Sequence, residues 1–347
     1  MFKLLRALIP RACRKTGDRT TFASLNATAP DNVIIDGVTP FPIAKHLSRH
    51  YGLPIIDWSA VESWMNGIQS PEGRRAAWID CERAWLLHFR SALGQHYRLA
   101  ESEGAILLSS LERHLADVTL GYVDRTRKHI VQVLEGIAQI PPLGKDLVIA
   151  FDDQETYYRY VSYYYPKGGE FAFSGGMQIS TGFSHFVTVK RDLRTIEPVI
   201  AHEMTHGCVA HLPLPLWLNE GLAVNTERRL AGSGSSHYTP QELREKHRAF
   251  WGKEEVQQFW SGDSFDRTDD GNLLSYDLAR IMVEQMAKRW EQFERFVLAA
   301  NRADAGALAA QRHLGVDLGD YVCALLGKRP SPGWGPDSSL WKNERAS

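Results

Sequence analysis

Apolar residues recur at three- and four-residue steps from about residue 61 to residue 138, which is typical of helices that bury one face. The clearest run spans residues 74–100, where one broad apolar face is formed by Trp78, Cys81, Trp85, Leu86 and Phe89. Residues 31–57 are interrupted by prolines and predict irregular structure. We therefore expect a mainly helical region before the middle of the chain.

The period of the pattern changes after residue 144. Residues 146–151 are apolar and β-branched, and residues 185–190 also carry strong strand formers, so both segments predict strands. Residues 171–180 show the alternating pattern of a strand, interrupted by glycines, and predict a third strand. The tyrosine-rich residues 156–165 are expected to pack their aromatic side on this sheet, as a helix or a strand.

The pattern is helical again beyond these strands. One helix is expected from about Pro198, with Thr195 as its cap, to Ala210. Pro215 can open the next helix, and the pattern then stays helical to about residue 326. The prediction is an α+β fold in which a small mixed sheet packs on the helix that ends near residue 210, with additional N-terminal and C-terminal helices.

Five segments follow from these changes of pattern. They are a basic tail (1–30), a mainly helical N-terminal region (31–115), a core with the sheet and the next two helices (116–230), a C-terminal helical subdomain (231–328) and a disordered tail rich in Pro and Gly (329–347). A chain of 347 residues with 44% hydrophobic residues suits one large or two modest domains.

Charge and cysteine content exclude several classes of protein. The net charge of −1 argues against a nucleic-acid partner, and no apolar run reaches the ~18 residues that span a bilayer. The four cysteines are scattered and form no C-x-x-C pair, so we expect neither a disulfide framework nor a cysteine metal cage. A cytoplasmic location is the simplest expectation.

The first 19 residues are unusually basic, with six Lys or Arg and no acid before Asp18. Phe2, Leu5 and Ile9 fall near one helical face, so a basic amphipathic helix could make weak contact with an anionic membrane surface or act as a transit-like segment. A frayed, solvated tail is the other interpretation, and it is the usual behaviour of termini.

The segment AHEMTHGCVA, residues 201–210, carries the candidate chemistry. Positions i and i+4 share one face of a helix, so His202 and His206 can offer ring nitrogens to one metal ion, with Glu203 beside them. Zinc suits such ligands and leaves a position for a water whose proton a carboxylate can take. H-E-x-x-H occurs by chance in roughly a few per cent of chains of this composition, so the motif needs support.

Two features of the surrounding sequence give that support. The neighbours of the motif are small or apolar, which indicates a buried helix, and buried polar groups need partners. Glu220 follows within PLWLNEGLAVN, in a polar Asn219-Glu220 pair on an otherwise apolar helix. Gly221 would permit that helix to approach the histidine helix closely. A first-turn acid favoured by the helix dipole is the alternative for Glu220.

H-E-x-x-H followed by W-x-N-E-G resembles the gluzincin metallopeptidases, especially their aminopeptidase-like branch and its short bacterial relatives. The resemblance covers roughly residues 120–290. It implies a thermolysin-like core and one Zn²⁺ ion bound by His202, His206 and Glu220, with Glu203 as the general base that activates water for hydrolysis of a peptide or protein substrate.

The resemblance also implies a substrate-binding strand. Residues 174–180, with Gly175, Gly176, Met177 and Gln178, resemble the G-x-M-E-N strand along which the family aligns a substrate backbone. Gln178 stands where the aminopeptidases have the glutamate that binds a free amino terminus. Because a neutral amide lacks that charge, we expect an endopeptidase.

Two further positions bear on this comparison. Tyr276 is the best match to a family tyrosine that donates to the oxyanion, although a structural tyrosine with its ring in the core is an equal alternative. Val224 stands where thermolysin-like relatives carry an aspartate that steadies a ligand histidine, so other residues must do this here. Three other histidines are interpreted as non-ligands: His185, His211 and His237.

Two rival functions remain at this point. The chain could be a binding or scaffolding module with a structural metal and little turnover, but such a site has no use for Glu203 and closes its fourth position. The same site could also hydrolyse a non-peptide amide.

Overall fold

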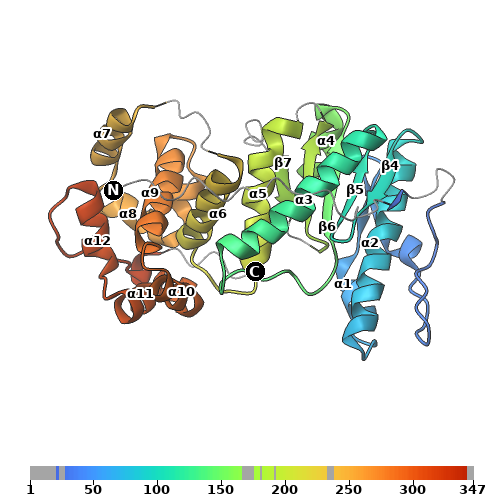
Figure 1. Cartoon of the computed structure of the whole chain (residues 1–347), viewed down its shortest axis with the longest axis horizontal. Helices are drawn as coiled ribbons and strands as arrows, with labels where there is room; N and C mark the ends of the chain where they lie inside the picture. The colour runs from blue at the N-terminus through green and yellow to red at the C-terminus, as the bar shows by residue number, and fades with distance from the viewer. Residues whose placement is uncertain are drawn as a thin grey trace, which may run out of the picture.

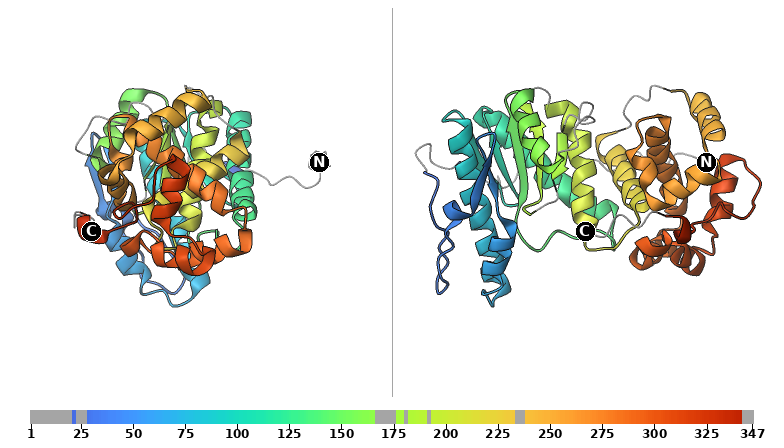
Figure 2. Two further views of the ribbon diagram at one scale, coloured as in Figure 1. Left: turned by 90° about the vertical axis from the view of Figure 1, so that its left-hand side faces the viewer. Right: turned by 180° about the vertical axis from the view of Figure 1, so that it is seen from behind.

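A computed structural model of the chain describes residues 21–22, 28–165, 176–179, 182–190, 193–232 and 238–341. The chain forms two halves along the long axis of the molecule: a mixed sheet with helices on both faces, and an assembly of helices (Figure 1). Seen from behind, the sheet half runs from blue to green and the helical half is orange and red (Figure 2). The α+β fold class is therefore confirmed.

The sheet has six described strands in the order β1-β4-β5-β6-β8-β7. Their bounds are Thr21–Phe22 (β1), Arg98–Glu101 (β4), Ala105–Ser109 (β5), Asp146–Phe151 (β6), Gly176–Ile179 (β7) and His185–Val189 (β8). Strands β5, β6 and β8 are parallel, whereas β4 and β7 pair antiparallel with their neighbours. A separate hairpin consists of β2 (Leu47–His50) and β3 (Leu53–Ile56).

Helices cover both faces of the sheet. Side chains alternate along β5, so that Ile106 and Leu108 join one apolar layer and Ala105 and Leu107 join the other. The first layer contains residues of α2 (Pro71–Leu93) and α4 (Gln154–Tyr164), and α1 (Trp58–Met65) lies beside it. The second layer contains residues of α3 (Arg113–Val133) and α5 (Leu193–Val209). The tyrosine-rich segment is thus a helix packed on the sheet.

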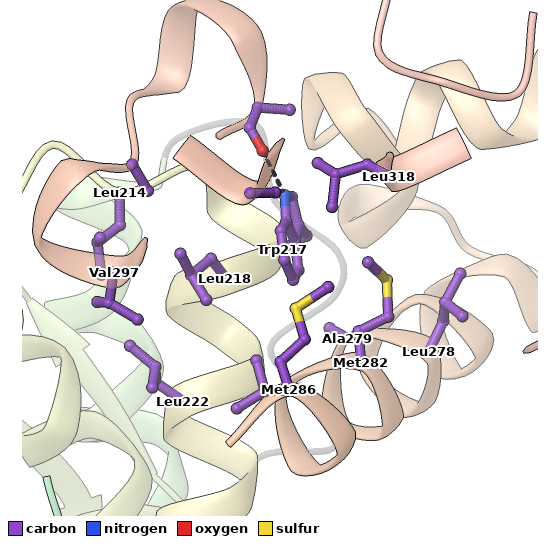
Figure 3. Packing of buried hydrophobic residues seen from close by; sticks show 14 of the residues in the cluster. Leu214, Trp217, Leu218, Leu222, Leu278, Ala279, Met282, Met286, Val297 and Leu318 are labelled. Atoms are coloured by element: carbon purple, nitrogen blue, oxygen red, sulfur yellow. Dashed lines mark hydrogen bonds between the residues drawn. The ribbon is translucent and has the colours of Figure 1, made fainter. Parts of the chain in front are cut away.

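The helical half is built around α6 and α9. Its helices are α6 (Leu216–Ala231), α7 (Pro240–Phe250), α8 (Lys253–Ser261), α9 (Asp270–Met286), α10 (Trp290–Ala299), α11 (Ala307–Leu314) and α12 (Leu318–Leu326). Trp217 of α6 is fully buried beside Met282 and Met286 of α9, and its indole N–H donates to the carbonyl of Ala305 at 3.0 Å (Figure 3). This anchor fixes the N-terminal part of α6 in the core.

Gly221 allows close packing of α6 on a different helix from the one predicted. A Cβ at this position would lie 2.8 Å from the backbone oxygen of Ala279 and 2.6 Å from Val283, both on α9. The expectation that Gly221 brings α6 close to the histidine helix is therefore wrong. The missing side chain serves the contact between α6 and α9 instead.

The sheet is larger than the sequence pattern predicts. Strands β6 and β8 and the helix that begins after Pro215 are confirmed. However, β4 and β5 lie within the region predicted to be helical, so the boundary at residue 115 separates strands of one sheet. All five residues of β5 are buried, and a strand buried on both faces shows no alternation that could be recognised.

Helix α5 also begins earlier than expected, at Leu193, so that Pro198 lies inside it and Thr195 is not its cap. Of the predicted strand 171–180, residues 176–179 form β7 and residues 171–175 lie outside the described residues. The basic segment before residue 21 also lies outside them. Across the described helices, none combines the length and the apolar character that a bilayer crossing requires.

The predicted disordered tail is wrong for residues 329–341. Trp334 is only 7% exposed and belongs to the core of the helical half. Its carbonyl accepts the indole N–H of Trp260 at 2.9 Å, and the Gln257 side chain donates to the carbonyls of Gly333 and Gly335. One large aromatic side chain and these hydrogen bonds hold a segment whose Pro and Gly content alone indicates disorder.

Replacing Trp334 by Ala is therefore expected to lower the free energy of unfolding by about 3–5 kcal/mol, because a buried aromatic side chain is lost from the core. Leu340→Ala is the control, since Leu340 is 63% exposed, and should stay within about 0.5 kcal/mol of wild type. Urea unfolding of the full chain measures both. Equal unfolding midpoints for the two variants would contradict the packing described here.

Candidate metal centre

Helix α5 lies at the boundary between the two halves of the molecule (Figure 1). Its residue Ile200 belongs to the core beneath the sheet, whereas Cys208 and Val209 belong to the core of the helical half. Met204 packs against both cores. Since α5 is held on two sides, the direction of the histidine side chains is fixed by packing.

His202, His206 and Glu220 converge at this boundary. Oε2 of Glu220 on α6 lies 3.2 Å from Nε2 of His202 and 3.5 Å from Nε2 of His206. The three candidate ligand atoms lie within 4.8 Å of one another. Ligands around a tetrahedral ion with bonds of about 2.0–2.1 Å are separated by roughly 3.3 Å. The two contacts of Glu220 match this separation, and a small closing movement of the ring nitrogens would let the three predicted residues bind a single metal ion.

The other ring nitrogen of each histidine has its own partner. Nδ1 of His202 donates to Oε2 of Glu227 at 3.2 Å, and Nδ1 of His206 donates to Oδ1 of Asn219 at 3.1 Å. When a cation displaces the proton on Nε2, these bonds keep the other proton on Nδ1 and leave each Nε2 lone pair directed at the shared point. Glu227 and Asn219 thus provide the ligand-orienting contacts that were expected from residues other than Val224.

Sequence reasoning overlooked these two partners, although one signal was present. Glu227 follows Glu220 by seven residues, which is two helical turns, so the two carboxylates lie on the same face of α6. Asn219 is adjacent to Glu220, and the sequence shows it only as a polar neighbour of that residue, with no sign of its contact with His206. Which of them contacts which ring depends on how α5 and α6 cross, and neither helix alone encodes that.

Burial is the largest single influence on the pKa of each of the three residues, but their hydrogen bonds and charge interactions together outweigh it. Burial alone would lower the pKa of His202, but hydrogen bonds to Glu220 and Glu227 raise it to about 10. Burial would likewise lower the pKa of His206, and its contact with Glu220 raises it. Burial would raise the pKa of Glu220, whereas hydrogen bonds from both histidines lower it to about 2. The carboxylate is therefore ionised at neutral pH, and a bound cation would replace protons on the rings.

Glu203 lies next to these residues and lines a cavity of about 400 Å³. Burial raises the pKa of its carboxyl, and the positive charges of His202 and His206 partly offset this. His206 and Gly207 line the same cavity, and a Cβ at Gly207 would meet no described atom within 4 Å. Because Gly207 follows Glu203 by one helical turn, the described residues leave open space on the face of α5 that carries Glu203.

Strand β7 borders this cavity and is an edge strand among the described strands. Gly176, Met177 and Gln178 lie on it, whereas Gly175 lies outside the described residues. Gln178 lines the cavity together with Glu203, and its amide donates to the hydroxyl of Ser184 at 2.5 Å. The predicted strand and the predicted base thus face one cavity.

Tyr276 of α9 also lies near the centre. Its ring centroid is 6.4 Å from that of His202 and 5.1 Å from that of Phe265, which it meets edge to face. Burial raises the pKa of its hydroxyl, and the charges of Glu220 and Glu203 raise it further. The ring packs on the core while the hydroxyl experiences the field of the site, so the two interpretations of Tyr276 are compatible.

Neither His185 nor His211 belongs to this group. His185 is fully buried, bonded to the Tyr160 hydroxyl at 2.7 Å, and burial lowers its pKa to about 4. His211 is exposed, and His237 lies outside the described residues. Among the described residues, His202, His206 and Glu220 form the group with metal-ligand geometry.

Comparisons with protein-family models, with curated proteins and with solved structures find no match to this chain. The functional assignment therefore depends on the geometry and chemistry of the site itself.

Glu227→Ala and Asn219→Ala are each expected to weaken metal binding by about 10- to 100-fold, because each removes the acceptor that orients one imidazole. Affinity is measured by competition with a chromophoric chelator. Glu284→Ala is the matched control, since it removes an exposed acid of α9, and should bind metal like wild type. Unchanged affinity in both test variants would show that Glu227 and Asn219 do not orient the ligands.

Metal affinity is also expected to fall as the pH falls from 9 to 7. The pKa of His202 is raised from 6.5 to about 10, so a metal ion must displace a proton from this ring throughout the range, and the pKa of His206 is also raised. Glu220 stays ionised there, because its pKa is about 2. The association constant should drop about tenfold per pH unit for each proton displaced. A pH-independent constant in the same chelator competition would contradict these charge states.

Proposed function

We propose that this protein is a zinc-dependent metallopeptidase that cleaves internal peptide bonds. The observation that carries the proposal is the convergence of His202, His206 and Glu220 at ligand distances beside Glu203, which lines a cavity. A mixed sheet against one side of α5 and helices on its other side support a thermolysin-like core. This arrangement also agrees with the resemblance of the two motifs to the gluzincins.

The donor set favours zinc over the hard cations. Two imidazole nitrogens and one carboxylate oxygen suit zinc, whereas Ca²⁺ and Mg²⁺ prefer sites made of oxygen alone. When bound, one zinc ion would polarise a substrate carbonyl and lower the pKa of a water molecule. Three carboxylates surround the two imidazoles, those of Glu203, Glu220 and Glu227. Their negative charge favours the binding of a divalent cation.

Glu203 is the general base of the proposed reaction. Its carboxylate is near enough to both histidines for their charges to lower its pKa, and burial counteracts them. A carboxylate with a raised pKa can accept a proton from the attacking water and return it to the leaving amine. Tyr276 is the proposed donor to the oxyanion, because its hydroxyl is in the field of Glu203 and Glu220.

The cavity and the edge strand support a peptide substrate. Among the described strands β7 forms an edge of the sheet, to which an extended peptide can add by backbone hydrogen bonds. Gly207 leaves room for the substrate backbone beside Glu203. Gln178 is neutral and provides no charge for a free amino terminus, which favours cleavage within a chain. A purely structural metal site would not need an acid with a raised pKa at an open cavity.

The test is hydrolysis of casein and of a quenched peptide library by the zinc-loaded protein. Glu203→Gln should retain about one zinc per chain and lose roughly 10²- to 10⁴-fold in kcat, because the base is removed and the ligands stay. Glu220→Ala should lose both the zinc and the activity. Metal analysis and the peptide assay are run on the same preparations.

Two variants keep this test decisive. Gly207→Leu places a side chain in the open space beside Glu203, so it should block peptides while zinc is retained. Arg312→Glu on α11 is the control variant: it is prepared in the same way and should retain both zinc and activity. Full zinc occupancy in a wild-type protein that cleaves no peptide would favour the structural-metal alternative. Cleavage of small amides but not peptides would favour the non-peptide substrate.

A further inference from the structure

The cavity beside Glu203 is bordered by both halves of the molecule. Strand β7 and the start of β6 line it from the sheet half, and the 3₁₀ helix η4 (Arg302–Asp304) lines it from the helical half. Its wall carries three Lys or Arg side chains, those of Arg127, Lys145 and Arg302. A fixed positive charge in this wall would select among the peptides that reach Glu203.

Two of these cations are already paired with acids. Nη1 of Arg127 lies 3.2 Å from Oδ2 of Asp146, and Nζ of Lys145 lies 2.6 Å from Oε1 of Glu101. Both basic side chains are mostly buried, with 13% and 11% of their surface exposed. They therefore belong to the structure of the cavity wall and have little capacity to bind an anion of the substrate.

Arg302 differs from them because it is exposed and has no acidic partner. Its Nε donates to the carbonyl of Leu214 at 2.9 Å, and no carboxylate of the described residues lies within ion-pair distance of its guanidinium. The nearby acid Asp304 accepts the backbone N–H groups of Gly306 and Leu308 instead. The terminal nitrogens of Arg302 are thus available to an anion that enters the cavity.

Hydrogen bonds fix the position of Arg302 relative to the metal centre. Leu214, which accepts its Nε–H, lies five residues before Asn219, whose side chain orients a ligand ring. Three residues after Arg302, the carbonyl of Ala305 accepts the indole N–H of Trp217 (Figure 3). Helix η4 is therefore attached to the start of α6, and Arg302 is held in a constant place beside the site.

We propose that Arg302 selects peptides that carry an acidic side chain close to the cleaved bond. This inference rests on the metallopeptidase function proposed above, because it assigns a substrate class to the same cavity. The planar guanidinium binds a carboxylate through paired N–H···O bonds, whereas a glutamine amide offers one acceptor and no charge. An acid at the cleaved bond itself would be repelled by Glu203 and Glu220, so the preferred acid lies one or more residues from that bond.

The first experiment measures binding, so that its result does not depend on turnover. The probes are pairs of fluorescent peptides that differ only by Glu or Gln at one position, and this position is moved along the sequence. They are titrated into the full-length Glu203→Gln protein loaded with zinc, and fluorescence anisotropy gives the Kd. At the preferred position, the Glu peptide should bind roughly fivefold or more tightly than the Gln peptide. Equal Kd values at every position would overturn the proposal.

Variants in the same background assign the preference to Arg302. Arg302→Ala should bring the ratio of the two Kd values to about one, and Arg302→Lys should keep part of it because the charge remains. Arg312→Ala is the matched control, since it removes another exposed arginine, which does not line the cavity, and should keep the full ratio. Zinc content and circular dichroism show that each variant is folded. A full ratio in folded Arg302→Ala protein would overturn the role of this residue.

A carboxylate can also come from the C-terminus of a peptide. Each Glu and Gln peptide is therefore prepared with a free and with an amidated C-terminus. If Arg302 binds an acidic side chain, amidation should change the Kd less than the exchange of Glu for Gln does. If amidation weakens binding more than this exchange, Arg302 binds the end of the chain, and the assignment to an acidic side chain is overturned.

A kinetic experiment separates this inference from the proposed function. Zinc-loaded wild type should cleave the Glu peptide with a kcat/KM roughly fivefold or more above that of the Gln peptide, and Arg302→Ala should cleave both at similar kcat/KM. Equal cleavage of both peptides by wild type would overturn the role of Arg302 while the peptidase function stands. Cleavage of neither peptide would count against the peptidase function, and the Kd ratio alone would then decide the role of Arg302.

Discussion

The contact of one carboxylate oxygen with two imidazoles across the α5–α6 interface is the constraint on which the candidate site depends. Oε2 of Glu220 lies 3.2 and 3.5 Å from the two Nε2 atoms, in a place where water is largely excluded. Burying a carboxylate is unfavourable unless charge or hydrogen bonds compensate it. Protons on the rings meet that need when no cation is bound, and a divalent ion can meet it in their place.

The packing around α5 and α6 holds these atoms at that spacing. Met204 on α5 contacts the cores of both halves, and Trp217 anchors the N-terminal part of α6 with a hydrogen bond to Ala305. Gly221 lets α6 approach the backbone of α9 closely. The histidine helix and the glutamate helix are thus each fixed by contacts outside the site, which spares the ligands most of the cost of becoming ordered on binding.

Local patterns predicted the parts of this site that lie close together in sequence. The spacing of His202 and His206 requires only a helix, and Glu220 could be inferred from the short motif around it. The partners Glu227 and Asn219 could not be assigned, because their contacts depend on how two helices cross. Strand β5 was missed for a related reason, since both of its faces are buried and it shows no alternation. The packed segment around Trp334 was also missed, because Pro and Gly content does not report the effect of a single anchored aromatic side chain.

Helix α6 combines two opposite surfaces, and this explains the distribution of its charges. The face toward α5 carries Glu220 and Glu227, whereas the far side carries Arg229 beside an apolar cavity. Cations on the metal-facing side would repel a metal ion and compete for the carboxylates, so their separation by the helix preserves the negative field at the histidines. Because Glu220 and Glu227 are fixed to one rigid helix, the position of α6 sets the distance of both carboxylates from His202 together.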